Sequence, residues 1–182
     1  LLNTINVGMM AAELTFSSDG TKAYVANGDD DSITVINTAT KAIVTTIAVG
    51  DNPVGAWTGS NNKMYVDNEA SQTISEISVS SMTVTSSINL GFKPGYVAYH
   101  TSRGELWVSN ATDGKVVYYT LVSGVWTLQG SIVTGADAHA ITFNSDGTKA
   151  FITNQGARSV SVIDVASHIV TQTIIVGTKP NG

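Results

Sequence analysis

Few side chains in this sequence belong to the types that catalyse reactions or bind metals. His139 stands in "DAHAITF", at the start of an apolar segment, and Glu13 occupies a similar place in "AELTF". A histidine and carboxylates that converge on a substrate can exchange protons with it, so these two residues are the candidate ligand contacts. The alternative for His139 is a hydrogen-bonded loop residue without a ligand. No combination of residues predicts a catalytic centre.

An acidic run, "GDDDS" at 28–32, contains the three adjacent carboxylates Asp29, Asp30 and Asp31. Calcium favours several carboxylate and carbonyl oxygens, which makes this run the one candidate calcium site. It lacks the spaced ligands and the final glutamate of an EF-hand loop, and the alternative is a solvated connection between two strands. The three histidines have no metal-ligand spacing, and cysteine is absent, so no metal or other cofactor is predicted.

Composition excludes several classes of partner. The net charge is -5 and no cluster of Lys or Arg occurs, whereas binding to nucleic acid requires a basic surface. No apolar run approaches the ~20 residues of a membrane-spanning helix. Charged residues make up only 13% of the chain, and Ser, Thr, Asn and Gly replace them beside many β-branched residues, which favours a β-rich protein.

Two short markers recur at one spacing. The first is an aromatic residue, a β-branched residue, a small or polar residue and an asparagine, as in "YVAN" (24–27), "YVDN" (65–68), "WVSN" (107–110) and "FITN" (151–154). The second is an apolar segment that ends in glycine, at residues 8, 50, 91, 135 and 177. The asparagines lie 41, 42 and 44 residues apart and the glycines 42, 41, 44 and 42. The sequence therefore predicts a tandem array of four repeats.

Each repeat contains four short strand patterns and no helical periodicity. In the first repeat the expected strands are 12–16, 22–27, 32–37 and 42–50, and the turn "SSDG" joins the first two. Asp-Gly between short apolar runs indicates a tight turn. Four short antiparallel strands in about 42 residues describe one blade of a β-propeller. The predicted fold class is all-β, a propeller of four-stranded antiparallel blades with about four blades present.

The second strand of each repeat is apolar almost throughout, which indicates burial between neighbouring blades. We expect its aromatic residue to fill the space between blades, at Tyr24, Tyr65, Trp107 and Phe151. We expect its terminal asparagine to bond backbone groups of the following loop, because asparagine side chains mimic a turn.

The segments "YVAN…DSITVINTATKAIVTTIAVGDNP" and "FITN…RSVSVIDVASHIVTQTIIVGTKP" resemble the YVTN β-propeller repeat family of microbial surface-layer and envelope proteins. The resemblance covers essentially the whole chain, although the Asp-Gly turn is replaced by Ser60-Asn61-Asn62 in the second repeat and by Arg103-Gly104 in the third. It implies an extracellular, cell-surface or periplasmic protein. It also implies a central channel, which His139 and Glu13 would face.

The expected blades are residues 9–50, 51–91, 92–135 and 136–177. Residues 1–8 have the pattern of the last strand of a preceding blade, and residues 178–182 that of the start of a further blade. We therefore expect a portion of a larger ring of about seven blades. A partner chain that closes the ring and a strained four-blade ring are the alternatives.

The leading functional hypothesis is a non-enzymatic exported propeller that acts as a structural or protein-interaction module in a cell-surface or extracellular assembly. Its partners would be other proteins or the remaining blades. The first alternative is a periplasmic enzyme with its site in the channel, either a lactonase-like hydrolase or a quinone- or metal-dependent oxidoreductase. The second is a carbohydrate-binding module. Asn110 begins the sequon "NAT" and is a candidate glycosylation site if the protein is exported.

Overall fold

The computed structural model describes residues 4–182, in which the chain forms sixteen β-strands and one short 3₁₀ turn. The strands make four antiparallel sheets of four strands each, and the strands of every sheet follow one another in chain order. The chain divides into two compact units, one up to Gly91 and the other from Phe92 onward. Each unit contains two sheets, which correspond to two repeats.

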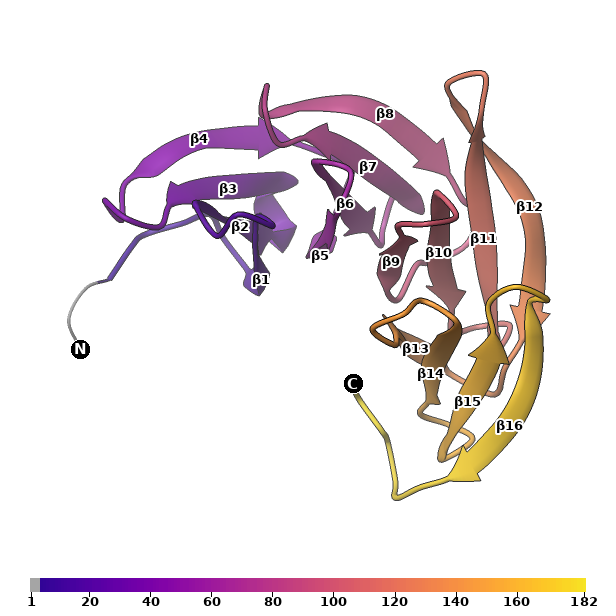
Figure 1. Cartoon of the computed structure of the whole chain (residues 1–182). Coiled ribbons are helices and arrows are strands. Elements are labelled where there is room, and N and C mark those ends of the chain that lie inside the picture. Colours follow the sequence, from indigo (N-terminus) through magenta and orange to yellow (C-terminus); the bar gives the residue numbers. More distant parts are fainter. Residues whose placement is uncertain (1–3) are drawn as a thin grey trace. The chain divides into compact units, whose positions relative to one another are not determined.

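The first unit contains the sheets of repeats 1 and 2, coloured indigo to magenta in Figure 1. The sheet of repeat 1 consists of β1 (Ala11–Phe16), β2 (Lys22–Asn27), β3 (Ser32–Asn37) and β4 (Ile43–Ala48). The sheet of repeat 2 consists of β5 (Pro53–Gly59), β6 (Lys63–Asn68), β7 (Thr73–Ser78) and β8 (Thr83–Asn89). The 3₁₀ turn η1 (Gly28–Asp30) lies within the acidic run 28–32, between β2 and β3.

The second unit contains the sheets of repeats 3 and 4 (Figure 1). The sheet of repeat 3 consists of β9 (Val97–His100), β10 (Glu105–Asn110), β11 (Lys115–Val122) and β12 (Val125–Val133). The sheet of repeat 4 consists of β13 (Ala138–Phe143), β14 (Lys149–Asn154), β15 (Ser159–Asp164) and β16 (Ile169–Ile175). None of the described residues forms a helix long and apolar enough to cross a membrane.

Tight turns join the first two strands of every repeat. The two Asp-Gly turns place Gly20 at φ 69° and Gly147 at φ 72°, in the left-handed region. Asn62 (φ 61°) and Gly104 (φ 63°) take the same place in repeats 2 and 3, which lack the Asp-Gly pair. The turn therefore requires a residue that accepts positive φ, and both Gly and Asn do so at low cost.

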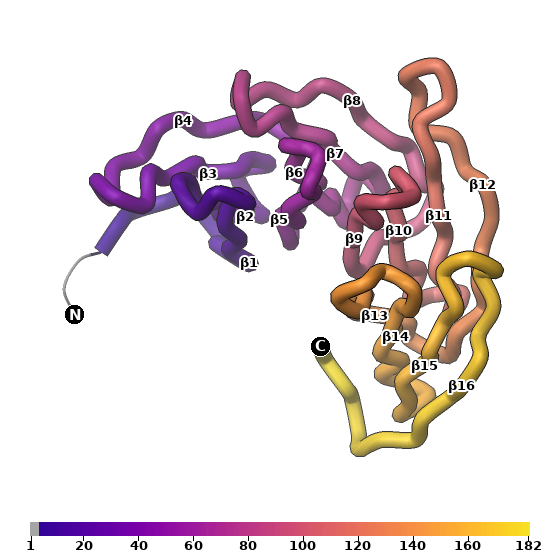
Figure 2. Tube along the Cα trace, viewed as in Figure 1, coloured from indigo at the N-terminus to yellow at the C-terminus, as the bar shows by residue number. Residues whose placement is uncertain are grey.

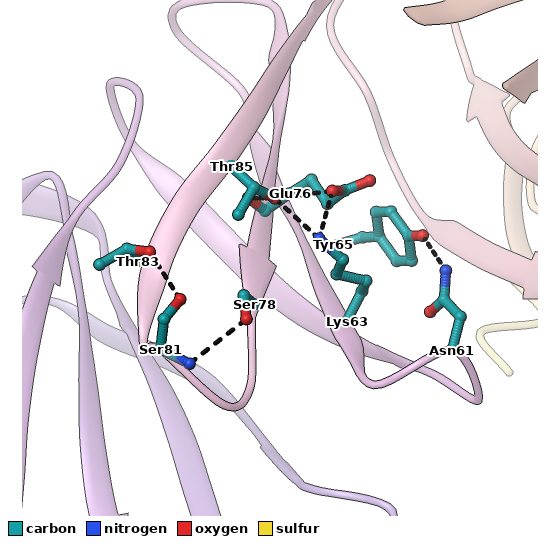
Figure 3. Close-up of polar contacts among 8 residues, drawn as sticks. All are labelled: Asn61, Lys63, Tyr65, Glu76, Ser78, Ser81, Thr83 and Thr85. Atoms are coloured by element: carbon teal, nitrogen blue, oxygen red, sulfur yellow. Dashed lines mark hydrogen bonds and ion pairs between the residues drawn. The ribbon is translucent and has the colours of Figure 1, made fainter. Parts of the chain in front are cut away.

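The fourth strand of each sheet (β4, β8, β12 and β16), which is the outermost strand of a propeller blade, carries a β-bulge near its start. The pairing with the third strand skips one residue in every sheet, namely Val44, Thr85, Gln129 and Thr171. In repeat 2 the hydroxyl of the bulged Thr85 donates to the backbone oxygen of Glu76 (3.3 Å) and to Oε1 of Glu76 (2.6 Å). The same Oε1 forms an ion pair with Nζ of Lys63 at 2.9 Å (Figure 3). A bulge bends a strand and interrupts the regular edge of its sheet.

Aromatic residues of the second strands fill the space between sheets within each unit, as predicted. In the first unit the buried Tyr24 belongs to a cluster that includes Met64 and Val66 of the next sheet. In the second unit the buried Trp107 belongs to a cluster that includes Ile141 and Ile152 of the next sheet. Phe151, in the last repeat, is only partly buried.

The terminal asparagines of the second strands bind side chains of the third strand, so the prediction of loop contacts is wrong in three repeats. In each of them Nδ2 donates to two hydroxyl groups, five and seven residues further along the chain. These contacts are Asn27 with Ser32 (3.1 Å) and Thr34 (2.9 Å), Asn68 with Thr73 and Ser75 (both 3.0 Å), and Asn154 with Ser159 (3.1 Å) and Ser161 (2.9 Å). The reason is geometric, because positions five and seven lie on the face of the paired strand that the asparagine also faces. We call this arrangement the asparagine clamp.

Three of the five recurring glycines contact the clamps, so in these repeats the two sequence markers belong to one arrangement. A Cβ atom added to Gly8 would lie 2.6 Å from Cγ of Asn27, and the corresponding distance from Gly50 to Asn68 is 2.8 Å. In the second unit, a Cβ added to Gly135 would lie 2.9 Å from Cγ of Asn154. Only glycine permits this approach of the chain that leads into the sheets of repeats 1, 2 and 4. Nothing lies within 4 Å of a Cβ added to Gly91, before the sheet of repeat 3, where its φ of 72° favours glycine instead.

The strands expected at the two ends of the sequence stay predictions. Of the segment 1–8, residues 1–3 lie outside the described residues, and residues 4–8 are in no strand. Ile5 and Val7 nevertheless pack against buried residues of the first sheet, Ala23, Val25 and Ile36. Residues 178–182 are also in no strand. A strand at either place would need a partner strand from its own sheet, and the described residues supply none.

Candidate functional site

The first strands of repeats 1, 2 and 4 (β1, β5 and β13), which are the innermost strands of propeller blades, begin with an irregularity in their pairing that turns side chains out of the regular pleat. Pairing with the second strand skips residues between Ala11 and Leu14, between Pro53 and Gly55, and between Ala138 and Ile141. Both predicted ligand contacts lie in these irregular segments, Glu13 in repeat 1 and His139 in repeat 4. Bulges often occur next to functional sites, where they redirect a side chain.

His139 is half-buried, and its Nδ1 is buried without a hydrogen-bond partner. Its ring centroid lies 6.4 Å from that of Tyr96, at a tilt of 57°. Glu13 is exposed and belongs to the first unit, whereas His139 belongs to the second.

A carboxylate that the sequence analysis did not single out lies near Glu13. Asp67, on β6, is 1% exposed, and its Oδ1 accepts hydrogen bonds from the backbone nitrogen of Gly55 (2.7 Å) and from Nε1 of Trp57 (3.3 Å). Its Oδ2 is buried without a partner. Burial raises the pKa of Asp67 well above its usual range, against the effect of these hydrogen bonds, and the charge of Glu13 adds to the rise.

Asp67 can hold a proton at a pH where surface carboxylates are ionised, and the charge of the exposed Glu13 favours that proton. A carboxyl group with a raised pKa is the acid of an acid–base pair, and a carboxylate at the surface can be its base. The third position of the repeated tetrad is Ala26, Asp67, Ser109 and Thr153 in the four repeats. A charged residue at this position, where the other three repeats have an uncharged one, was the sequence feature that could have identified Asp67.

The acidic run has no metal-binding geometry. Asp30 Oδ2 accepts a hydrogen bond from the backbone nitrogen of Met9 (2.7 Å), and Asp31 Oδ1 accepts one from that of Asn52 (2.9 Å). Asp29 is exposed. The carboxylates of Asp30 and Asp31 therefore bind the connections that lead into β1 and β5. Within residues 4–182, no three His, Asp or Glu side chains converge as metal ligands would.

Asn110, the candidate glycosylation site, is buried at the end of β10 with 1% of its surface exposed. Its Nδ2 donates to Asp113 Oδ2 (3.1 Å), and its Oδ1 accepts from the backbone nitrogen of Asp113 (3.1 Å). Because a glycosylated amide must be accessible, modification would require the end of β10 to open. The glycosylation of Asn110 stays a prediction.

A second polar cluster joins the two sheets of the second unit. Glu105, at the start of β10, is 3% exposed, and its Oε1 accepts a hydrogen bond from Nε of Arg103 (2.7 Å). Its Oε2 lies 2.9 Å from Nε1 of Trp107 and 3.1 Å from Nε2 of His168, in the β15–β16 turn. The imidazole of His168 stacks on the ring of Tyr118 at 4.0 Å and 3°.

Glu105 is held in its charged form within this cluster. Burial opposes its ionisation, but the hydrogen bonds from Trp107, Arg103 and His168 lower the pKa of its carboxyl below the usual value. Both carboxylate oxygens are occupied, so the cluster holds two sheets together and presents no unused group to a substrate. Sequence analysis missed it because Glu105 and His168 lie 63 residues apart and at different repeat positions.

A cleft of about 250 Å³ lies between the β9–β10 and β13–β14 turns of the second unit. His100 lines it and is 4% exposed, with Nε2 2.8 Å from the backbone oxygen of Gly147. Since a carbonyl oxygen only accepts, Nε2 carries the proton. Two other polar side chains bond within the turn: Asp146 Oδ1 accepts from both the nitrogen and Oγ1 of Thr148, and Asn144 Oδ1 accepts from the nitrogen of Lys149. The cleft therefore offers few unused polar groups.

Comparison with solved structures establishes the fold. The chain superimposes on Kuenenia stuttgartiensis hydrazine synthase with a TM-score of 0.80 and 19% identity, covering 97% of this chain and 53% of that chain. On the Pseudomonas aeruginosa periplasmic gluconolactonase PpgL it superimposes with a TM-score of 0.77 and 17% identity, covering 94% of this chain and 55% of that chain. On the β-propeller domain of Myceliophteria thermophila Cps50 (Swd1) the TM-score is 0.83 and the identity 9%, and the superposition covers 98% of this chain and 59% of that chain.

These comparisons confirm the predicted fold class, an all-β propeller of four-stranded antiparallel blades. The chain spans between one half and three fifths of the length of these structures. Their activities differ, and at such low identity the likeness shows a fold and not an activity. No protein-family model matches the chain, and no curated protein matches it in sequence. The YVTN resemblance therefore rests on the repeat residues themselves.

Proposed function

We propose that the chain is part of a non-enzymatic, exported β-propeller of the YVTN type that serves as a structural or protein-interaction module in a cell-surface or extracellular assembly. The observation that carries the proposal is the character of the outermost strands. β4, β8, β12 and β16 contain no Asp, Glu, Lys, Arg or His, and most of their residues are exposed.

Exposed edge strands without charge are unusual, because charged side chains are a common protection against pairing with other chains. Large apolar residues are exposed on these strands too, among them Ile43, Val84, Leu128 and Ile169. Thr83, Thr85, Thr171 and Thr173 are exposed on these strands, while Thr45 is partly buried. Hydroxyl and apolar groups together suit contacts with another protein surface.

The proposal is tested by placing one charge on each outermost strand. Thr46, Ser87, Ser131 and Thr173 are exposed and occupy equivalent repeat positions. The variant in which all four are replaced by Glu should keep the circular dichroism spectrum of the full-length protein and lose its assembly in sedimentation and electron microscopy. Unchanged assembly of this variant contradicts the proposal.

The proposal includes a ring of about seven blades, of which this chain supplies four. Four blades of seven are a little more than half of a ring, and the chain likewise covers 53%, 55% and 59% of the three solved structures. The intact mass of the native protein is the direct measurement. A mass of 19.0 kDa, that of this chain alone, would contradict the larger ring.

One observation favours an enzyme as the second candidate. Asp67 is a buried carboxyl group with a raised pKa, near the exposed Glu13, as an acid–base pair requires. We would assay the full-length protein for hydrolysis of gluconolactone and compare Asp67→Asn with the wild type. Hydrolysis that Asp67→Asn abolishes, in a variant that remains folded, would establish the enzyme and overturn the non-enzymatic proposal.

A further inference from the structure

The clamp asparagine of repeat 1 is followed directly by a glycine, whereas Glu69, Ala111 and Gln155 follow the asparagine in the other repeats. The Asn27–Gly28 bond lies between β2 and β3 in the first unit, near the indigo end of the chain in Figure 2. Asparagine before glycine is especially prone to deamidation, because glycine has no side chain that shields its backbone nitrogen. Repeat 1 therefore carries a chemically labile pair at the position of its clamp.

The packing of repeat 1 requires this glycine. A Cβ atom added to Gly28 would lie 2.9 Å from Oδ1 of Asn52 and 3.4 Å from Sδ of Met10, on the segments that lead into β5 and β1. The backbone nitrogen of Gly28 also donates to the backbone oxygen of Met10 at 3.0 Å. A side chain at this position would push these segments away, so the labile pair is built into the fold of the repeat.

The side-chain amide of Asn27 is held at both of its polar atoms. Nδ2 donates to Oγ of Ser32 (3.1 Å) and Oγ1 of Thr34 (2.9 Å), and Oδ1 accepts from the backbone nitrogen of Gly8 (3.1 Å). The same oxygen is buried without a partner in the clamps of repeats 2 and 4. Asn27 is 0% exposed, and a Cβ added to Gly8 would lie 2.6 Å from its Cγ. The carbon that deamidation attacks is therefore enclosed.

Deamidation requires the backbone nitrogen of Gly28 to attack Cγ of Asn27. The nitrogen gives its proton to a base in the solvent, its lone pair forms the N–Cγ bond, and the Cγ–Nδ2 bond breaks as ammonia leaves with a proton from water. Water then opens the cyclic imide to aspartate or isoaspartate. In the folded protein the nitrogen must first leave Met10, and the amide must leave its two hydroxyl partners.

We propose that Asn27–Gly28 is a deamidation site that the clamp of repeat 1 keeps closed, and that it reacts only when this end of β2 and β3 opens. A buried bond reacts through local opening of the structure, and its rate then follows the population of the open form. The inference concerns the lifetime of the folded sheet. It goes beyond the proposed function and does not depend on it.

The reaction would make an opening of repeat 1 irreversible. The Cβ position at Gly8 lies 2.5 Å from Oδ2 of Asp30 and 2.6 Å from Cγ of Asn27, so the carboxylate of Asp30 is close to the amide. Deamidation places a second carboxylate there, at a buried position where a charge is costly. Isoaspartate also lengthens the main chain, which breaks the pairing of Asn27 with Ala11 and Ser32.

The rate of deamidation at Asn27 in the native full-length protein tests the proposal. Peptide mapping by mass spectrometry follows the conversion at pH 8. The tryptic peptide 23–41 contains the same Asn-Gly pair without the fold and gives the unprotected rate. We expect the native protein to react at least about tenfold more slowly than this peptide. Equal rates in the protein and the peptide overturn the proposal.

Weakening the clamp shows whether the clamp provides the protection. Ser32→Ala with Thr34→Val removes both hydroxyl acceptors of the Asn27 amide and should raise the native rate about tenfold. The matched control, Ser159→Ala with Ser161→Ala, removes the equivalent acceptors in repeat 4 and should leave the rate at Asn27 unchanged. Circular dichroism checks that both variants are folded, and the comparison with the peptide needs neither of them. A rise in both variants alike, or in neither, overturns the proposal.

Discussion

Repeat 3 and the other three repeats use the same asparagine in different ways. Where Ser or Thr follows at five and seven residues, the asparagine clamps the second strand to the third. In repeat 3 those positions are Lys115 and Val117, and Asn110 bonds Asp113 in the adjacent turn instead. The asparagine is thus common to the repeats because it can satisfy either role, and the residues around it decide which one it takes.

A second difference accompanies the first. The second strand begins with Lys22, Lys63 and Lys149 in three repeats and with Glu105 in repeat 3. In repeat 2, Lys63 forms an ion pair with Glu76 inside its own sheet. Glu105 instead contacts His168 of the neighbouring sheet. The first residue of the second strand thus forms an ion pair within its sheet in repeat 2, whereas in repeat 3 it also makes a contact between sheets.

The largest expected effect comes from removing that contact between sheets. Glu105→Ala leaves the buried Trp107 Nε1 and His168 without their acceptor, and should lower the free energy of unfolding by about 3 kcal/mol. Denaturant unfolding of the full-length protein measures the change. Glu105→Gln, which keeps an acceptor oxygen and the side-chain shape, should cost distinctly less. Equal losses in both variants would mean that packing, and not the hydrogen bonds, holds the sheets together.

The next effect tests the clamp against its counterpart in repeat 3. Asn154→Ala removes two buried hydrogen bonds to Ser159 and Ser161 and should cost about 2 kcal/mol. Asn110→Ala removes contacts to a turn beside an exposed aspartate and should cost about 1 kcal/mol. Both changes are measured by denaturant unfolding. A larger loss for Asn110→Ala would reverse the comparison.

The fold was predictable because two markers with one period fix the number and length of the sheets. The clamp was visible in the sequence, as hydroxyl residues at five and seven positions after Asn27, Asn68 and Asn154. It was missed because asparagine at a strand end has an equally sound local explanation in turn mimicry. The contact between Glu105 and His168 has no periodic pattern, since it depends on the packing of one sheet against the next.

A smaller effect concerns the residue before the clamp asparagine in repeat 2. The pKa of Asp67 is raised by burial, so the folded protein binds its proton more tightly than the unfolded chain does. The stability that this proton contributes is complete below the ordinary aspartate pKa of about 3.9, and is lost as the pH rises through the raised value. Asp67→Asn cannot ionise and therefore lacks this loss. Its free energy of unfolding at pH 8 should be about 1 kcal/mol higher than that of the wild type.

The comparison across pH isolates this group. The advantage of Asp67→Asn should shrink as the pH falls toward 4, because the wild-type carboxyl is then protonated in the folded protein and about half protonated in the unfolded chain. Titrations of the unfolding midpoint for the two proteins between pH 4 and pH 8 give the difference directly. A difference that stays constant over this range would mean that Asp67 is not protonated more tightly in the folded state.

The smallest effect comes from building the clamp into repeat 3. Lys115→Ser with Val117→Thr supplies Asn110 with hydroxyl groups at five and seven residues, at the loss of a partly exposed ion pair between Lys115 and Asp113. The double variant should differ from the wild type by less than about 1 kcal/mol, because a buried methyl group is exchanged for a satisfied hydroxyl. The informative measurement is the added cost of Asn110→Ala in this background. If the clamp forms, that cost should rise toward the cost of Asn154→Ala. If it does not rise, Asp113 retains the asparagine, and the turn, not the third strand, determines its role in this repeat.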